Sequence, residues 1–199
     1  MSERIQTITV LGAGDAGRAV AYLSALAGYR TILEDLSGQV AGAALAEIRV
    51  AAEEELQAGR LLPADAAALV ARLESGKALE RAAAQADLII EAAPDDLETK
   101  IEVYTIIDRA ATPRCVFASI SPLSITEIAS LTYRAAQVLG MHFAGPPRQA
   151  KLVELVRGLD TSDAALAAVE QVALRMGKEV VLVRESPGLI ARPPPRAAR

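Results

Sequence analysis

His142 is the only histidine of the 199-residue chain, and it follows an apolar run from Gln137 to Met141. Glu154 stands twelve residues further on, beyond a Gly-Pro-Pro stretch that favours a turn, so two adjacent strands can bring the pair together. A carboxylate against one imidazole nitrogen fixes the tautomer, stabilises the imidazolium and leaves the other nitrogen free as a general base. Spacing alone favours a different interpretation, a half-buried histidine and a separate solvated glutamate.

Hydroxyl groups follow a second apolar segment. Ser119 and Ser121 stand where the strand Val116–Ser119 is expected to end. The carboxyl ends of strands face the ligand crevice in an open α/β sheet, so Ser121 is a candidate to bind a substrate oxygen. Taken alone, such a serine is more often a turn or cap residue. Ser124 is expected to cap a short helix, because Glu127 follows it at capping-box spacing.

A glycine-rich segment near the start of the chain has the spacing of a phosphate-binding loop, Gly12-Ala13-Gly14-Asp15-Ala16-Gly17. Gly12 permits a tight turn, Gly14 lets the backbone approach a pyrophosphate, and Gly17 lets a helix pack closely on a strand. Free N–H groups and the positive dipole end of the following helix would hold the phosphates. The alternative is a chance glycine-rich turn in an alanine-rich protein.

The elements around this loop decide between the two interpretations. Thr7–Leu11 is an expected buried strand, Arg18–Leu23 an expected helix with Gly28 at its end, and Arg30–Glu34 a second strand. Asp35 stands at the tip of that strand, eighteen residues after the last glycine. Strand, glycine spacing, helix and acidic residue together predict a βαβ dinucleotide-binding unit with its acid on the adenosine ribose.

Strands and helices continue to alternate along the rest of the chain. Two helices, 39–56 and 63–73, form a helical excursion after the second strand. The remaining expected strands are 88–92, 116–119, 137–141, 151–156 and 179–184, and the remaining expected helices are 97–111, a short one after Ser124, and 162–176. This order predicts an α/β fold, a Rossmann-type doubly wound and mostly parallel sheet. We predict a single domain over residues 1–191 and a proline/arginine-rich tail over 192–199.

Composition excludes several classes of protein. The net charge is −4 and no basic run occurs, so neither nucleic acid nor a membrane surface is an expected partner. A lone cysteine, Cys115, rules out an intrachain disulfide and favours a reducing compartment, the cytoplasm. No signal-peptide core precedes the first strand, and no apolar stretch is long enough to span a bilayer. No metal site is predicted.

Together these features resemble the NAD-binding domain of the L-3-hydroxyacyl-CoA dehydrogenases, which include the 3-hydroxybutyryl-CoA dehydrogenases of fatty acid metabolism. The resemblance extends from about Ile5 to Ile190. The segments that carry it are VLGAGDAGRAVA, LEDLS, ADLIIEAAPDDLETK, FASISPLSITEIA, GMHFAGPPRQAKLVELV and RESPGLI. The separation of His142 from Glu154 is that of the family, which favours the paired interpretation.

The resemblance implies specific roles. His142 would accept the proton of a 3-hydroxyl group while hydride leaves C3 for the nicotinamide of NAD, Glu154 would orient His142, and Ser121 would contact the substrate oxygen. Lys100 would reach cofactor hydroxyls, and Asp95 stands where the family has a glutamate near the nicotinamide. The implied cofactor-binding set is Gly12, Gly14, Asp15, Ala16, Gly17, Asp35, Ala93, Asp95, Lys100 and Ser119.

Departures from the family pattern concern the polar groups of the active site. Gly145 replaces the asparagine of an HFFNP motif, Ile120 replaces another asparagine, and Arg192-Pro193 replaces an Asn-Arg pair. The helical domain that closes the acyl-CoA cleft and forms much of the family's dimer is not evident in the sequence. We therefore expect the chain to bind NAD(H), to reduce 3-ketoacyl-CoA poorly by itself, and to pair with a second copy or a separate helical chain.

Three functions remain open from the sequence. The first is an NAD-dependent 3-hydroxyacyl-CoA dehydrogenase, and the second is a non-catalytic NAD(H)-binding module. The third is a related dehydrogenase that acts on a smaller hydroxy acid or sugar acid. Retention of His142 and Glu154 favours the first and third, whereas the replaced asparagines favour the second.

Overall fold

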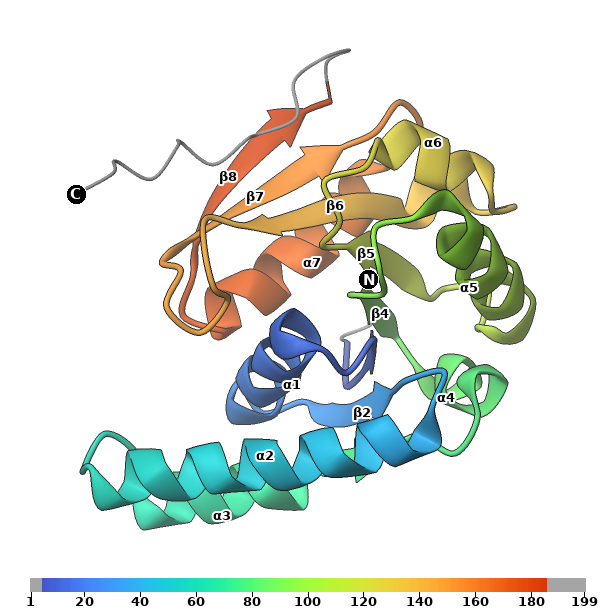
Figure 1. Ribbon diagram of the computed structural model, residues 1–199. Helices are drawn as coiled ribbons and strands as arrows, with labels where there is room; N and C mark the ends of the chain where they lie inside the picture. The colour runs from blue at the N-terminus through green and yellow to red at the C-terminus, as the bar shows by residue number, and fades with distance from the viewer. Residues whose placement is uncertain (1–4, 186–199) are drawn as a thin grey trace, which may run out of the picture.

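The computed structural model of the protein describes residues 5–185, and an eight-stranded sheet runs through its centre with helices on both faces (Figure 1). The strands are β1 (Thr7–Leu11), β2 (Arg30–Glu34), β3 (Leu73–Ser75), β4 (Leu88–Glu91), β5 (Val116–Ser119), β6 (Val138–Phe143), β7 (Leu152–Arg157) and β8 (Glu179–Arg184). Their order is β3-β2-β1-β4-β5-β6-β7-β8, and only the β6–β7 pair is antiparallel. The predicted doubly wound, mostly parallel sheet is confirmed.

Two apolar cores flank the sheet. The helices are α1 (Asp15–Leu26), α2 (Gly38–Gln57), α3 (Pro63–Ala71), α4 (Leu79–Gln85), α5 (Leu97–Ala110), α6 (Ile125–Ser130) and α7 (Asp163–Arg175). Helices α1 and α7 cover one face, with α2 and α3 packed along the outer side of α1. Helices α4, α5 and α6 cover the other face (Figure 1). Because both faces are covered, central strands such as β1 are buried at every position, which explains their nearly continuous apolar sequences.

Side-chain caps mark the starts of three helices. The Asp96 carboxylate accepts a hydrogen bond from Thr99 N at 2.8 Å at the start of α5. Ser124 Oγ accepts one from Glu127 N at 3.1 Å, and Ser162 Oγ accepts one from Ala165 N at 3.2 Å. The predicted cap at Ser124 is confirmed, and each bond satisfies an N–H group that has no partner within its helix.

The structure differs from the sequence prediction in the positions of some elements, and it contains elements that were not predicted. The helix expected over 63–73 ends at Ala71, and Leu73–Ser75 instead forms edge strand β3, parallel to β2. Helix α4 (Leu79–Gln85) was not among the predicted elements. The strand expected over 137–141 runs from Val138 to Phe143 and so includes His142. Three residues are too few to show an alternating pattern, and an alanine-rich segment without a cap gives little helical signal.

The topology gathers the candidate site at one edge of the sheet. Strands β1, β2, β4, β5 and β6 run parallel, so their carboxyl ends meet at the same edge. The strand order reverses between β1 and β4, where ligands bind in open α/β sheets. The glycine loop follows β1, Ala92 follows β4, and His142 lies near the end of β6.

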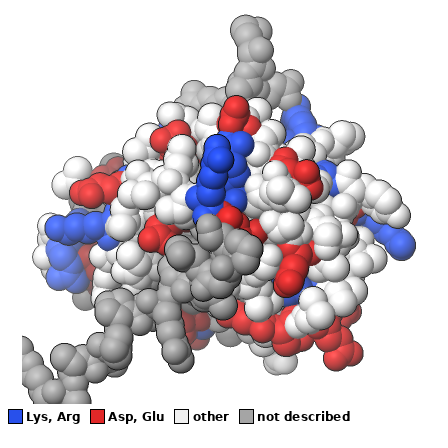
Figure 2. All heavy atoms as spheres, turned by 90° about the horizontal axis from the view of Figure 1, so that it is seen from above, with Lys and Arg blue, Asp and Glu red and all other residues white. Residues whose placement is uncertain are grey.

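The surface and the helices add two observations on partners. On the face shown in Figure 2, Lys and Arg side chains are separated by Asp and Glu side chains. Within residues 5–185, no helix combines the length and the apolar character needed to cross a membrane.

Candidate dinucleotide and proton-transfer site

The three loop glycines meet different surroundings. Gly12 has φ +97°, and a Cβ there would overlap the carbonyl oxygen of Ala92. A Cβ on Gly17 would overlap the carbonyl oxygen of Gly12, so the start of α1 can approach β1 only through a glycine. At Gly14, by contrast, no described protein atom lies within 4 Å of the Cβ position. Gly12 and Gly17 are required by the fold, whereas Gly14 borders open space that a ligand could enter.

The first turn of α1 has free N–H groups at this open space. No side chain of the described chain caps α1, and its N-cap is Gly14. The only acidic residue of the first turn, Asp15, is exposed and ion-paired with Arg18. Backbone N–H groups and the positive end of the helix dipole therefore face outward together, an arrangement suited to a pyrophosphate.

Asp35 is attached to the glycine loop. Its Oδ2 accepts a hydrogen bond from Ala13 N at 2.8 Å, and its Oδ1 accepts one from Ser37 N at 3.1 Å. The carboxylate thus lies beside the loop at the end of β2, as the ribose-binding prediction requires. The neighbouring Glu34 points elsewhere: it is buried against Gly76, and burial raises the pKa of its carboxyl.

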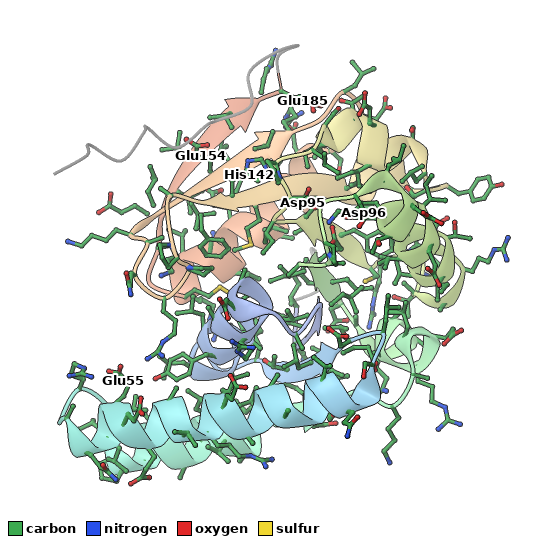
Figure 3. All side chains as sticks on the ribbon, in the orientation of Figure 1. Glu55, Asp95, Asp96, His142, Glu154 and Glu185 are labelled. Carbon is green, nitrogen blue, oxygen red and sulfur yellow. The ribbon has the colours of Figure 1, made fainter. Side chains whose placement is uncertain are left out.

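His142 and Glu154 are paired across the β6–β7 ladder. They are direct partners in the antiparallel register, which places both side chains on the same face of the sheet. Figure 3 shows Glu154, Glu185 and Asp95 around His142, from β7, the end of β8 and the β4–α5 loop. The adjacency that the family resemblance favoured is confirmed, against the interpretation that the spacing alone favoured, and the roles of the two residues stay predictions.

The environment of His142 favours the neutral ring. Burial lowers the pKa of His142, although a hydrogen bond with the main chain of Ser121 and the charges of Glu154, Asp95 and Glu185 oppose this effect. Its Nε2 atom is buried and has no hydrogen-bond partner among the described residues. A neutral imidazole with an unpaired buried nitrogen is equipped to accept a proton.

Ser119 is the last residue of β5, and Ser121 lies in the turn that follows. Ser119 is fully buried, and its Oγ accepts a hydrogen bond from Ser121 N at 3.2 Å. Ser121 is 2% exposed, and its Oγ accepts a hydrogen bond from Leu123 N at 3.2 Å. The Ser121 main chain raises the pKa of His142, so this turn is part of the histidine's immediate surroundings.

Lys100 is fully buried in an ion pair. Its Nζ lies 2.6 Å from Glu91 Oε1 and 3.7 Å from Asp95 Oδ1, and it donates a hydrogen bond to the Ala93 carbonyl at 3.0 Å. Asp95 is exposed at the same loop, and the cofactor contacts of Ala93, Asp95, Lys100 and Ser119 stay predictions. Sequence reasoning missed Glu91. Its signal was a lone carboxylate at the end of the apolar strand Leu88-Ile89-Ile90.

At two positions where the resembled family has an asparagine, this chain has no polar side chain. Gly145 has φ +122° in the β6–β7 connection and supplies no side chain. Ile120 follows β5 and packs against the core of the α1 and α7 face. Arg192, Pro193 and the rest of the predicted 192–199 tail lie outside the described residues, as does the end of the predicted 1–191 domain.

Comparison with known proteins agrees with this geometry. Residues 7–186 match the family described as 3-hydroxyacyl-CoA dehydrogenase, NAD binding domain. The chain belongs to this family. NAD is the family's cofactor, and the open space at Gly14 together with the uncapped start of α1 fits a dinucleotide.

Individual relatives match this chain over most of its length. It is 35% identical over 188 residues to a Bacillus subtilis (strain 168) protein named "Probable 3-hydroxybutyryl-CoA dehydrogenase", a match that covers 94% of this chain. The crystal structure of (S)-3-hydroxybutyryl-CoA dehydrogenase from Ralstonia eutropha aligns with a TM-score of 0.87, 33% identity and 92% coverage of this chain. The 3-hydroxybutyryl-CoA dehydrogenase structure from Escherichia coli K12 aligns with a TM-score of 0.89, 30% identity and 94% coverage. This chain spans 65% of the first two relatives and 40% of the third.

Proposed function

We propose that the chain provides the NAD site and the general base for oxidation of an L-3-hydroxyacyl-CoA to the 3-ketoacyl-CoA. The observation that carries the proposal is His142, a neutral half-buried imidazole opposite Glu154 at the edge of the sheet where the glycine loop lies. Family membership and the names of the relatives support the reaction class.

His142 is the proton acceptor in this reaction. Its unpaired ring nitrogen takes the proton from the 3-hydroxyl of the substrate as the C3–H bond breaks. Bound NAD⁺ supplies the hydride acceptor. The Glu154 carboxylate stabilises the imidazolium that results, and Ser121 Oγ holds the substrate oxygen within reach of the ring.

Turnover by the chain alone is expected to be slow. A closed cleft excludes water and aligns the reacting atoms, and this chain spans 65% of the length of its 3-hydroxybutyryl-CoA dehydrogenase relatives. A second copy of the chain or a separate helical protein would supply the other wall. Val181 and Leu182 of edge strand β8 are exposed apolar residues, one on each face of the sheet, against which such a partner could pack. Sedimentation as a monomer together with turnover at ordinary enzyme rates would contradict this part of the proposal.

One observation favours a second function, an NAD(H)-binding module without turnover. Gly145 and Ile120 stand where the family places asparagines, so two polar groups that stabilise the reacting atoms are missing. The dinucleotide half of the site does not depend on them.

Two measurements on the purified chain separate the functions. Fluorescence titration with NADH tests binding, and oxidation of NADH by acetoacetyl-CoA at high protein concentration tests turnover. A matched His142→Gln variant keeps polar volume and removes the proton acceptor. NADH binding with turnover that disappears in the variant supports the dehydrogenase. Binding without turnover supports the module, and unchanged turnover in the variant refutes the assignment of the base.

A further inference from the structure

A buried ion pair lies beneath the candidate site. The side chains of Glu91 and Lys100 are both 0% exposed, and Lys100 Nζ lies 2.6 Å from Glu91 Oε1. Removing two charges from water costs about as much as their attraction returns, so such a pair contributes little to stability compared with apolar side chains of the same volume. Its position and its further hydrogen bonds indicate what else it does.

On one side, the pair holds the loop that follows β4. Glu91 Oε1 accepts a hydrogen bond from Ala93 N at 2.6 Å, and Lys100 Nζ donates one to the Ala93 carbonyl at 3.0 Å. Both polar groups of one backbone residue are thus fixed by the same ion pair. This loop adjoins the dinucleotide site, because the carbonyl of Ala92 packs directly against Gly12.

On the other side, the pair reaches toward the histidine. Glu91 Oε2 accepts a hydrogen bond from Ser119 Oγ at 2.8 Å, and Ser119 Oγ accepts one from Ser121 N at 3.2 Å. Ser121 lies beside His142, because its main chain is among the groups that raise the pKa of the ring. A series of hydrogen bonds therefore runs from the loop after β4 to Ser121, next to the ring of His142.

We propose that Glu91, Lys100 and Ser119 form a positioning network that fixes the dinucleotide loop and His142 relative to each other. The inference rests on the proposed function, because concerted loss of a proton and a hydride requires both acceptors to be aligned at once. Lys100 and Ser119 act through Ala93 and Ser121. In this network they are positioning residues, because the hydrogen bonds described for their buried polar atoms go to the protein, and this role is separate from the cofactor contacts predicted for them.

Ser119→Ala tests the link to the histidine. The variant keeps the ion pair and its two hydrogen bonds with Ala93, but it removes the hydrogen bond that Ser121 N donates to Ser119 Oγ. The matched control is Ser24→Ala, which removes an equally buried serine hydroxyl from a 2.8 Å hydrogen bond inside α1, remote from the site. Any change seen in Ser119→Ala alone then reports the network and not the loss of a buried hydroxyl in general.

The primary readout is an NMR titration of the imidazole. His142 is the only histidine, so its ring signals are assigned without further work. The Ser121 contact favours the protonated ring, so Ser119→Ala should lower the pKa of His142, and Ser24→Ala should leave it unchanged. The carboxylates that face the ring, Glu154, Asp95 and Glu185, are present in both variants. Turnover should fall about tenfold in Ser119→Ala.

The combined variant Glu91→Gln/Lys100→Met tests the pair itself. Each single substitution leaves a buried charge without its partner and should destabilise the fold, whereas the double variant is neutral and should regain much of that stability. If the pair positions the loops, the double variant still binds NADH about tenfold more weakly, and its His142 titration is shifted even without NADH, where a direct contact of Lys100 with the cofactor plays no part. If the pair only fills space, affinity and titration recover together with stability.

The outcomes distinguish the network from the proposed function. A His142 titration and a turnover rate that match the wild type in Ser119→Ala would overturn the network. A lowered His142 pKa in a chain that shows no turnover would support the network and refute the dehydrogenase assignment. Recovery of NADH affinity in the double variant would overturn the role of the ion pair at Ala93.

Discussion

The two halves of the site are built in different ways. The dinucleotide half lies within one βαβ unit, from β1 to Asp35, and depends on backbone shape: two glycines that admit close contacts, one that borders open space, and an uncapped helix. The proton-transfer half gathers His142, Glu154 and the Ser119–Ser121 turn from three strands, and it depends on register, burial and a buried ion pair. Substitutions in the first half should change binding, those of His142, Glu154 and Ser121 should change chemistry, and those of the ion pair, which adjoins both halves, should change both.

Replacement of His142 should give the largest difference between an effect on turnover and an effect on NADH binding. His142→Ala removes the general base, and turnover should fall by roughly 10²- to 10⁴-fold. NADH affinity should be nearly unchanged, because the phosphates are held at the glycine loop. Parallel titrations with NADH and assays with acetoacetyl-CoA check both statements. Wild-type activity in His142→Ala would show that His142 is not the base.

Cofactor choice should depend on the first half alone. A 2′-phosphate about 4 Å from the Asp35 carboxylate costs roughly 4 kcal/mol at an effective dielectric of 20, about a thousandfold in affinity. Two arginines are the candidates to offset this charge among the described residues. Arg30 lies at the other end of β2 and pairs with Glu74, and Arg18, which donates a hydrogen bond to the Ala13 carbonyl at 3.2 Å, is already paired with Asp15 and Glu47. NADH should therefore bind about a thousandfold more tightly than NADPH.

Asp35→Asn provides the control for cofactor choice. The amide retains an oxygen that can accept the bond from Ala13 N, so the loop is preserved while the charge is removed. Discrimination against NADPH should shrink in this variant. Equal affinity of the wild-type chain for NADH and NADPH in fluorescence titrations would refute the prediction.

The glycines offer a matched pair within one loop. Gly14 has an extended backbone, φ −68° and ψ −176°, that alanine adopts freely, and its Cβ would meet no described atom within 4 Å. Gly14→Ala should therefore fold normally and lose about a hundredfold in NADH affinity, because the methyl group enters the space for the pyrophosphate. Gly17→Ala should instead destabilise the chain by about 1–3 kcal/mol or more, through overlap with Gly12.

Thermal unfolding and NADH titration together distinguish these glycines. Unchanged NADH affinity in Gly14→Ala would mean that the dinucleotide does not approach the loop there. Wild-type stability in Gly17→Ala would mean that α1 does not require the close contact with β1.

Sequence reasoning succeeded where structure is local. The glycine spacing, the strands on either side and Asp35 lie within about thirty residues, so the pattern alone defines the βαβ unit. Strand β3 was missed because three edge residues show no periodicity, and their pairing with β2 is a long-range contact. Helix α4 was missed for a related reason, since packing against α5 holds a short segment that lacks a cap.

The proton-transfer half shows the same limit. The separation of His142 and Glu154 allowed their adjacency, because a connection of this length lets two antiparallel strands pair in that register, but only the family resemblance favoured it. Glu91 was missed because its partners Lys100 and Ser119 lie on other elements. A carboxylate within an apolar strand was nevertheless a usable signal, since a buried charge needs a partner.

The smallest expected effect concerns the charge beside the histidine. Glu154→Gln removes a carboxylate that raises the pKa of His142 and leaves burial, which lowers it. The pKa should therefore fall further below its ordinary value. Turnover should fall about tenfold, because the imidazolium formed in the reaction loses a stabilising charge. NMR titration of the sole histidine measures the first effect, and NADH oxidation by acetoacetyl-CoA measures the second.

The same variant makes a prediction about stability that involves no substrate. In the unfolded chain His142 is protonated below about pH 6.5, whereas in the folded chain its lowered pKa means that it is protonated only at a lower pH. The contribution of this residue is therefore present above about pH 6.5 and is lost as the pH falls. Glu154→Gln widens the gap between the two pKa values, so its free energy of unfolding should fall more steeply between about pH 7.5 and about pH 5.5. His142→Ala should lack this contribution to the pH dependence of stability. Urea unfolding at several pH values measures the free energy of unfolding. If it changes equally with pH in the wild type, Glu154→Gln and His142→Ala, Glu154 does not act on the ring.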